Sequence, residues 1–172
     1  GWAGDQMCLT IVVCSFGMLA PTKLSDRLLA AWQRSTLADD AHCRLIFVGE
    51  NHGGDYGRAL TATITKAAGG ARIDITGFVN AQTYNDYLAA ADVAVQLRAD
   101  SRGETSAAIF DALGAGLALV VNAHGSAAEL PAGVAMALPD HFSDDALTQA
   151  LQRLREDAAQ RLQLGAAAQD WI

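Results

Sequence analysis

Lysine is rare in this sequence, and one of its two lysines ends a glycine-containing loop. The loop reads Phe16-Gly17-Met18-Leu19-Ala20-Pro21-Thr22-Lys23 and follows a strongly apolar segment. Gly17 permits a close backbone approach, and Pro21 stiffens the turn. A helix is expected directly afterwards, so the Lys23 ammonium and the free N–H groups of the helix start can meet a phosphate together. A solvent-exposed lysine in a connecting loop is the simpler interpretation, and this segment alone favours it.

A second group of polar residues begins in the segment Arg102-Gly103-Glu104-Thr105-Ser106. Glu104 and Asp111 are seven positions apart, or two helical turns, so a helix would carry them on one face. Thr105 and Ser106 would bring hydroxyls and free N–H groups to the positive end of that helix. Carboxylates accept hydrogen bonds from sugar and ribose hydroxyls, and a helix N-terminus attracts phosphate. An ordinary helix start, with Asp111 on a solvated face, explains the same residues equally well.

Three further segments offer weaker candidates. Gly77-Phe78-Val79 follows a predicted strand, where the backbone can pair with a base and Phe78 can stack on it, although core packing is the more common role of such a side chain. His124 follows another strand and is more often a loop residue than a catalytic group. Glu50 and Asp55 lack the further ligands that a metal site needs. We therefore expect neither a metal nor an organic cofactor.

Short apolar segments alternate with amphipathic ones, which predicts strands and helices in turn. The predicted strands are 9–15, 44–48, 73–76, 92–97, 117–122 and 134–138, and the predicted helices are 25–34, 55–68, 80–91, 104–115, 126–130 and 143–165. Ser25, Asn80 and Ser143 are the expected N-caps. This order predicts an α/β fold, a doubly wound parallel sheet of about six strands with helices on both faces. Ligands of such sheets bind beyond the carboxyl ends of the strands, here the loops 15–23, 49–54, 77–81 and 98–105.

Composition narrows the classes of function. The net charge is −7, and no cluster of basic residues offers a nucleic-acid-binding face. The longest apolar runs are too short to span a bilayer, and no secretion signal opens the sequence. Three cysteines without a C-x-x-C pair suggest neither a disulfide framework nor a zinc site. We expect residues 1–172 to form one domain in the cytoplasm, with peripheral attachment of a parent protein to the inner membrane face left open.

Five segments also match, in order, one set of family motifs. Residues 16–23 are similar to a G-R-L-x-P-x-K loop, 45–50 to a strand ending in V-G, and 75–79 to an F-x-G-x-V segment. Residues 84–97 are similar to L-x-x-x-Y-x-x-A-D-V-x-V-x-P, and 102–122 to an acidic pair followed by E-A-M-A-x-G-x-P-V-V. These are motifs of glycosyltransferase family 4, and the chain resembles the C-terminal, Rossmann-like half of its GT-B fold over residues 11–138. The R-G-E-T-S form is similar to that of bacterial members.

This resemblance implies a site for a nucleotide diphosphate sugar. Lys23 would hold the diphosphate and help the nucleotide leave, Glu104 would hydrogen-bond the donor sugar, and Asp111 would accept from the ribose hydroxyls. The other implied binding residues contribute mainly backbone groups and are Gly17, Phe78, Val79, Thr105 and Ser106. The reaction implied is transfer of a sugar to an acceptor, with retention. The implied partner is an N-terminal domain of the same parent protein, which carries the acceptor site, so this domain alone would bind the donor without turnover.

The sequence departs from the family pattern at three points. Met18 stands where the family has a phosphate-binding arginine, Glu104 is displaced by one position because Gly103 occupies the usual site of the first acid, and Asp111 replaces a glutamate. These departures leave open a second interpretation, a non-catalytic partner module with a degenerate donor site. Another GT-B enzyme, such as an epimerase or a phosphorylase, is a third. An NAD-dependent enzyme fits less well because the dinucleotide fingerprint is absent.

Overall fold

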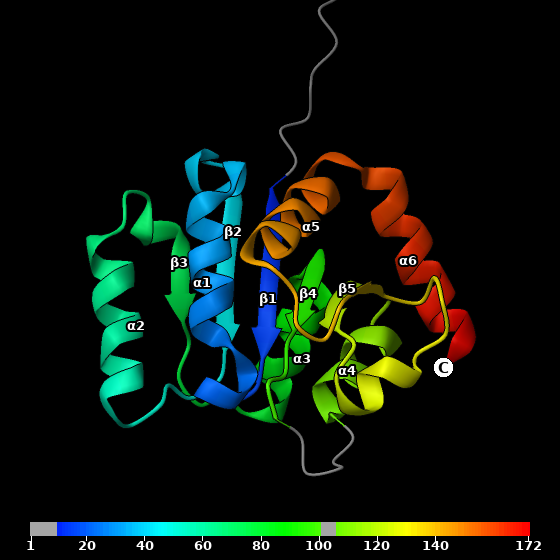
Figure 1. The fold of residues 1–172 in the computed structure, drawn as a ribbon, viewed down its shortest axis with the longest axis horizontal. Helices are drawn as coiled ribbons and strands as arrows, with labels where there is room; N and C mark the ends of the chain where they lie inside the picture. Colours follow the sequence, from blue (N-terminus) through cyan, green and yellow to red (C-terminus); the bar gives the residue numbers. More distant parts are fainter. Residues whose placement is uncertain (1–9, 101–105) are drawn as a thin grey trace, which may run out of the picture.

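The computed structural model describes residues 10–100 and 106–172, in which strands and helices alternate along the chain (Figure 1). The strands are β1 (Ile11–Phe16), β2 (Cys43–Val48), β3 (Ile73–Ile75), β4 (Val93–Gln96), β5 (Ala118–Asn122) and β6 (Met136–Leu138). The α-helices are α1 (Ser25–Arg34), α2 (Asp55–Lys66), α3 (Ala81–Ala90), α4 (Ala107–Gly114), α5 (Asp144–Glu156) and α6 (Ala158–Trp171). Four 3-10 turns join them: η1 (Pro21–Lys23), η2 (Thr36–Asp39), η3 (Gly70–Arg72) and η4 (Gly125–Glu129).

All six strands pair in parallel in the order β3-β2-β1-β4-β5-β6, which confirms the predicted doubly wound sheet. The chain winds outward from β1 to β3 and then returns to place β4 on the other side of β1. The strand order therefore reverses between β1 and β4. At such a point the loops leaving two neighbouring strands diverge to opposite faces, which opens a crevice at the carboxyl edge of the sheet.

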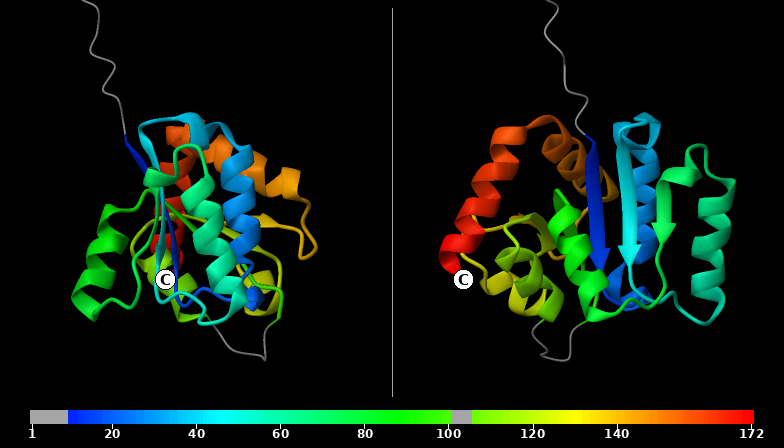
Figure 2. Two further views of the ribbon diagram at one scale, coloured as in Figure 1. Left: turned by 90° about the vertical axis from the view of Figure 1, so that its left-hand side faces the viewer. Right: turned by 180° about the vertical axis from the view of Figure 1, so that it is seen from behind.

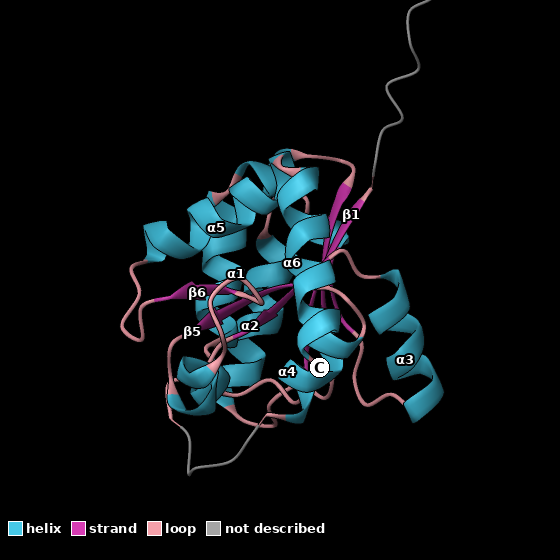
Figure 3. Cartoon of the chain, turned by 90° about the vertical axis from the view of Figure 1, so that its right-hand side faces the viewer, coloured by secondary structure: helices cyan, strands magenta, loops and turns pink. Residues whose placement is uncertain are grey.

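Helices cover both faces of the sheet (Figures 2 and 3). One core cluster joins α1, α2 and α5 to one face, with Trp32, Phe47 and Leu147 among its fully buried side chains. A second cluster joins α3 and α4 to the other face. Helix α6 contributes Leu164 to the first cluster and Ala168 to the second. Strands β4 and β5 are buried along their whole length, as expected for a sheet covered on both sides.

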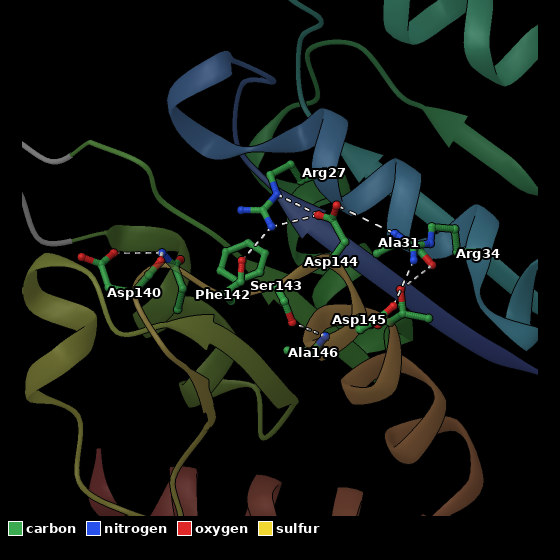
Figure 4. A network of polar contacts seen from close by, with 11 residues as sticks. Arg27, Ala31, Arg34, Asp140, Phe142, Ser143, Asp144, Asp145 and Ala146 are labelled. Atoms are coloured by element: carbon green, nitrogen blue, oxygen red, sulfur yellow. Dashed lines mark hydrogen bonds and ion pairs between the residues drawn. The ribbon is translucent and has the colours of Figure 1, made fainter.

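Ion pairs fasten α5 to α1 (Figure 4). The Arg27 guanidinium lies 2.9 Å from Asp144, donates to the Phe142 carbonyl and sits 3.9 Å above the Phe142 ring. Arg34 pairs with Asp145 at 3.0 Å. The two acidic residues occupy the first turn of α5, where they also favour the helix dipole. This contact holds α1, which starts two residues after Lys23, against α5.

Two sequence-based expectations about helix ends are wrong. Ser25 does not cap α1: the N-cap is Leu24, in the left-handed conformation, and the Tyr56 hydroxyl accepts the Asp26 N–H at 2.9 Å instead. The helix predicted over 143–165 is two helices, because Asp157 leaves the helical conformation. Its carboxylate caps α6 by accepting from Gln160 N–H, while Arg161 donates to the last carbonyls of α5. Side chains thus satisfy the backbone groups that the break exposes.

Candidate functional site

A cavity of about 350 Å³ lies at the carboxyl edge of β1 and β4, where the strand order reverses. Three segments supply most of its walls: residues 15–19 at the end of β1, residues 96–98 at the end of β4, and residues 106–109 at the start of α4. Lys23, Ser25, Phe47 and Tyr84 complete the lining. The structure thus brings the predicted lysine loop and the predicted helix start into one site.

Glycines fix the loop that carries Lys23. Gly17 has a φ of +109°, and a Cβ added there would lie 2.6 Å from the Lys23 Nζ atom, so the ammonium rests directly over the glycine backbone. A Cβ on Gly49 would lie 2.2 Å from the Gly17 carbonyl oxygen. The loops after β1 and β2 therefore touch backbone to backbone, and Leu19 N–H donates to the Glu50 carbonyl at 3.0 Å. The approach of Gly49 to the Gly17 carbonyl leaves no room for a side chain, so it fixes the backbone path at the start of the Lys23 loop.

The pKa of Lys23 lies below its ordinary value, chiefly because burial disfavours the charged ammonium and secondly because the positive charge of Arg98 is nearby. Both side chains line the cavity. Among the lining residues in the described part of the chain, these two are the charged ones, and no carboxylate joins them. An electropositive cavity in a protein with a net charge of −7 is suited to an anion.

Gln96 is a buried polar side chain at the base of the cavity, with 8% exposure. Its Oε1 atom accepts the Phe16 N–H at 2.7 Å, and its Nε2 atom donates to the Phe16 carbonyl at 2.9 Å. The amide thereby extends the pairing of β1 and β4 at the point where the Lys23 loop begins. Sequence reasoning missed this residue, although an isolated glutamine at the end of an apolar strand is the signal that could have identified it.

Asp111 lies on α4 and is held by Tyr84 of α3. The tyrosine hydroxyl donates to the Asp111 Oδ2 atom at 2.8 Å, and the Tyr84 ring packs edge-on against Phe16 with centroids 5.2 Å apart. Burial and the adjacent Asp111 carboxylate raise the pKa of Tyr84, so its hydroxyl stays a donor. Asp111 itself is exposed and outside the cavity lining, whereas Tyr84 lines it. The sequence predicts Tyr84 within the helix 80–91 but does not predict this role.

The remaining sequence candidates are spread more widely. Ser106 lines the cavity and caps α4 by accepting from Ile109 N–H, whereas Glu104 and Thr105 lie outside the described residues. The expectation that Phe78 packs in the core is wrong, because its side chain is 84% exposed, and it is not part of the cavity lining either. Val79 packs against the core cluster on the α3 and α4 face. His124 pairs with Asp140 at 2.8 Å and does not line the cavity.

Two further features concern metal binding and membrane crossing. In residues 10–100 and 106–172, no group of three or more His, Cys, Asp or Glu side chains is arranged to hold a metal ion. Within the same ranges, no helix combines the length and the apolar character needed to cross a bilayer.

The fold and the cavity define a doubly wound α/β domain with a ligand site at its topological switch point. The family model of the group 1 glycosyl transferases matches residues 10–157, which is most of the 172-residue chain. The chain therefore belongs to the group 1 glycosyl transferases, and the resemblance to the C-terminal domain of the GT-B fold is confirmed. No curated protein sequence matched significantly.

Solved structures with the same fold include several glycosyltransferases. The C-terminal domain of LpcC, a group 1 family glycosyl transferase from Francisella tularensis, aligns with a TM-score of 0.83 at 16% identity over 94% of this chain and 84% of that one. Anabaena HepE, solved in complex with UDP and glucose, aligns with a TM-score of 0.80 at 22% identity over 94% of this chain and 43% of its own. WaaG, a glycosyltransferase involved in lipopolysaccharide biosynthesis, aligns with a TM-score of 0.80 at 18% identity over 94% of this chain and 42% of its own. This chain thus spans less than half the length of HepE and WaaG.

Proposed function

We propose that this domain binds the nucleotide diphosphate sugar donor of a glycosyltransferase, with the diphosphate between Lys23 and the start of α4. The observation that carries the proposal is the meeting of the Lys23 ammonium and a helix N-terminus in one cavity at the switch point of the sheet. The complex of HepE with UDP and glucose supports a nucleotide as the class of ligand.

The chemistry of this position is stabilisation of a leaving group. In sugar transfer, the bond between the anomeric carbon and the β-phosphate oxygen breaks, and negative charge develops on the departing nucleoside diphosphate. The Lys23 ammonium lies over Gly17 in the cavity, where its charge can stabilise the negative charge of the departing diphosphate. The acceptor hydroxyl forms the new bond to the anomeric carbon and passes its proton to the departing diphosphate.

The rest of the donor follows from the same placement. Asp111, held by Tyr84, accepts hydrogen bonds from the ribose hydroxyls, and the backbone at Phe78 and Val79 meets the base. Glu104 hydrogen-bonds the donor sugar, and the N–H groups of Thr105 and Ser106 approach the sugar or the phosphates. The acceptor comes from an N-terminal domain of the parent protein, and transfer proceeds with retention. The part of the longer HepE and WaaG chains that this chain does not span leaves room for such a domain.

A second candidate is a non-catalytic module that binds the donor in support of an active partner. The observation that favours it is Met18, which lines the cavity without a charge at the position where the family motif has arginine. The two candidates share the binding site and differ in turnover. Assays of the parent protein with a panel of donor sugars separate them, since transfer or hydrolysis of any donor contradicts the non-catalytic candidate.

An NMR titration of the ¹⁵N-labelled chain with UDP, GDP and ADP tests the binding proposal. We expect saturable shifts in residues 16–23 and 106–111 with one of the three nucleotides. Lys23→Ala should weaken that binding by roughly 10- to 100-fold, the range for one hydrogen bond to a charged group. Lys66→Ala is the matched control, because Lys66 is the other lysine and lies exposed at the end of α2. Absence of shifts with all three nucleotides at millimolar concentration would contradict the proposal.

A further inference from the structure

Arg98 is the second cation of the cavity, and no motif singles it out within the predicted ligand loop 98–105. It directly follows Leu97 at the carboxyl end of β4 and lines the same cavity as the start of α4. Its side chain forms no hydrogen bond or ion pair with any other residue of the described ranges. A guanidinium has five N–H donors, and within the described residues no carboxylate engages that of Arg98, which lines the cavity.

The backbone of Arg98 is fixed in the same way as the end of β1. Asn122, which is 1% exposed at the end of β5, accepts the Arg98 N–H at 2.8 Å and donates to the Arg98 carbonyl at 2.6 Å. The next residue, Ala99, donates its N–H to the Thr22 carbonyl at 2.8 Å. The residue beside Lys23 is therefore hydrogen-bonded to the residue beside Arg98, which couples the positions of the two cations.

Two like charges in one partly desolvated cavity repel each other, and the pKa of Lys23 is lowered by burial and by Arg98 accordingly. A monoanion can neutralise one of them, whereas a ligand with two adjacent phosphates can neutralise both. Arg98 also supplies the positive charge that Met18 does not. A planar guanidinium can bind one phosphate through two parallel hydrogen bonds while an ammonium binds the other as a point charge.

We propose that Arg98 is a specificity-determining residue that binds one phosphate of the donor diphosphate while Lys23 binds the other, so that the site selects nucleoside diphosphates over monophosphates. This inference rests on the proposed donor-binding function, which it deepens. Arg98 then distinguishes a nucleoside diphosphate from the monophosphate, whereas Lys23 binds a phosphate that both ligands have.

The test compares wild type with Arg98→Met, which keeps an unbranched stem and removes the charge. Calorimetry is run with the nucleoside diphosphate that binds wild type and with the corresponding monophosphate. We expect Arg98→Met to weaken diphosphate binding by roughly 10- to 100-fold and monophosphate binding by less than about threefold. Arg98→Lys keeps the charge but cannot form two parallel hydrogen bonds to one phosphate, so its diphosphate affinity should lie between those of wild type and Arg98→Met. Arg153→Met removes an exposed charge on α5 and is the matched control. Diphosphate affinity within about twofold of wild type, or an equal loss for both ligands, would overturn the inference.

Two readouts separate this inference from a failure of the proposed function. Inorganic pyrophosphate carries two phosphates and no base, so its binding to wild type and loss in Arg98→Met would support the two-cation site even if no nucleotide bound. Binding of neither a nucleotide nor pyrophosphate to wild type would overturn the inference. Because the chain has two lysines, ¹³C NMR of their ε-carbons can follow Lys23 alone. Its pKa should rise in Arg98→Met, and an unchanged pKa would contradict the closeness of the two cations.

Discussion

Substituting Gly17 by alanine should separate the stability of the domain from its affinity for a phosphate ligand. Gly17 has a φ of +109°, and the added Cβ would come within 2.6 Å of the Lys23 Nζ atom. Gly133 offers a matched control, because its φ is +89° and a Cβ there meets nothing within 4 Å. Gly133 precedes β6 and therefore lies at the amino end of the sheet, away from the cavity.

The expected magnitudes follow from these contacts. Both substitutions force a side chain into a backbone conformation that favours glycine, which destabilises the fold by about 1–3 kcal/mol. The collision at Gly17 adds little to this, because the Lys23 ammonium is the far end of a flexible chain and can retreat. It must retreat by roughly 1 Å to reach ordinary contact distance, and displacements of that size can remove most of a well-placed polar contact. We expect about tenfold weaker binding, or half of the roughly 3 kcal/mol that a charged hydrogen bond can contribute.

Urea unfolding gives the stability of both variants, and calorimetry gives their affinity for the nucleoside diphosphate that binds wild type. Gly17→Ala and Gly133→Ala should unfold within about 0.5 kcal/mol of each other, since they differ mainly in what the Cβ meets. Only Gly17→Ala should lose affinity. If the two variants bind the ligand equally well, then the position of the ammonium over Gly17 does not matter for binding, and the reasoning about the Lys23 loop is refuted.

Three other substitutions or treatments test the remaining parts of the structure. Lys23→Met should raise the free energy of unfolding near pH 7 by up to about 1 kcal/mol. The reason is that a lysine whose pKa is lowered in the folded state opposes folding while it is charged. Urea titrations should show that this gain shrinks as the pH rises toward the ordinary lysine pKa. Asp157→Ala should lower stability by about 1 kcal/mol through loss of the α6 cap, while Asp170→Ala, an exposed change on the same helix, should leave it nearly unchanged; equal losses would contradict the capping role. Cys14, whose pKa burial and Asp92 raise to about 12, should resist iodoacetamide in the native protein and react in urea, as followed by mass spectrometry; rapid native labelling would contradict its burial.

The sheet could be predicted from the sequence because its strands are buried on both faces and read as continuous apolar runs. β4 and β5 illustrate this, since neither exposes a residue and both were expected within one or two positions of their observed ends. Helix ends were harder, because a capping group can come from a distant part of the chain. The Asp26 N–H finds its acceptor in Tyr56, thirty residues away, and Ser25 therefore has no capping role. The apolar periodicity of α5 and α6 similarly concealed the break at Asp157.

The site was only partly predictable for a related reason. Lys23 and Ser106 stand next to glycine and helix-start signals, and the structure places both on the cavity. Arg98 opens the predicted ligand loop 98–105, but its closeness to Lys23 depends on β4 lying beside β1, which is a property of the strand order. Phe78 shows the opposite problem, since its apolar side chain suggested burial but the loop after β3 leaves it 84% exposed.

One hydrogen-bonding arrangement occurs twice at neighbouring strand ends beside the cavity. Gln96 at the end of β4 accepts from and donates to the backbone of Phe16, and Asn122 at the end of β5 does the same for Arg98. Each amide continues the hydrogen bonding of the sheet beyond the last paired residue and satisfies its own polar atoms at the same time. The backbone segments that lead to Lys23 and Arg98 are therefore fixed by the sheet rather than by a ligand. Because these backbone positions are set by the strand ends, Lys23 and Arg98 line one cavity, where a diphosphate can neutralise both charges.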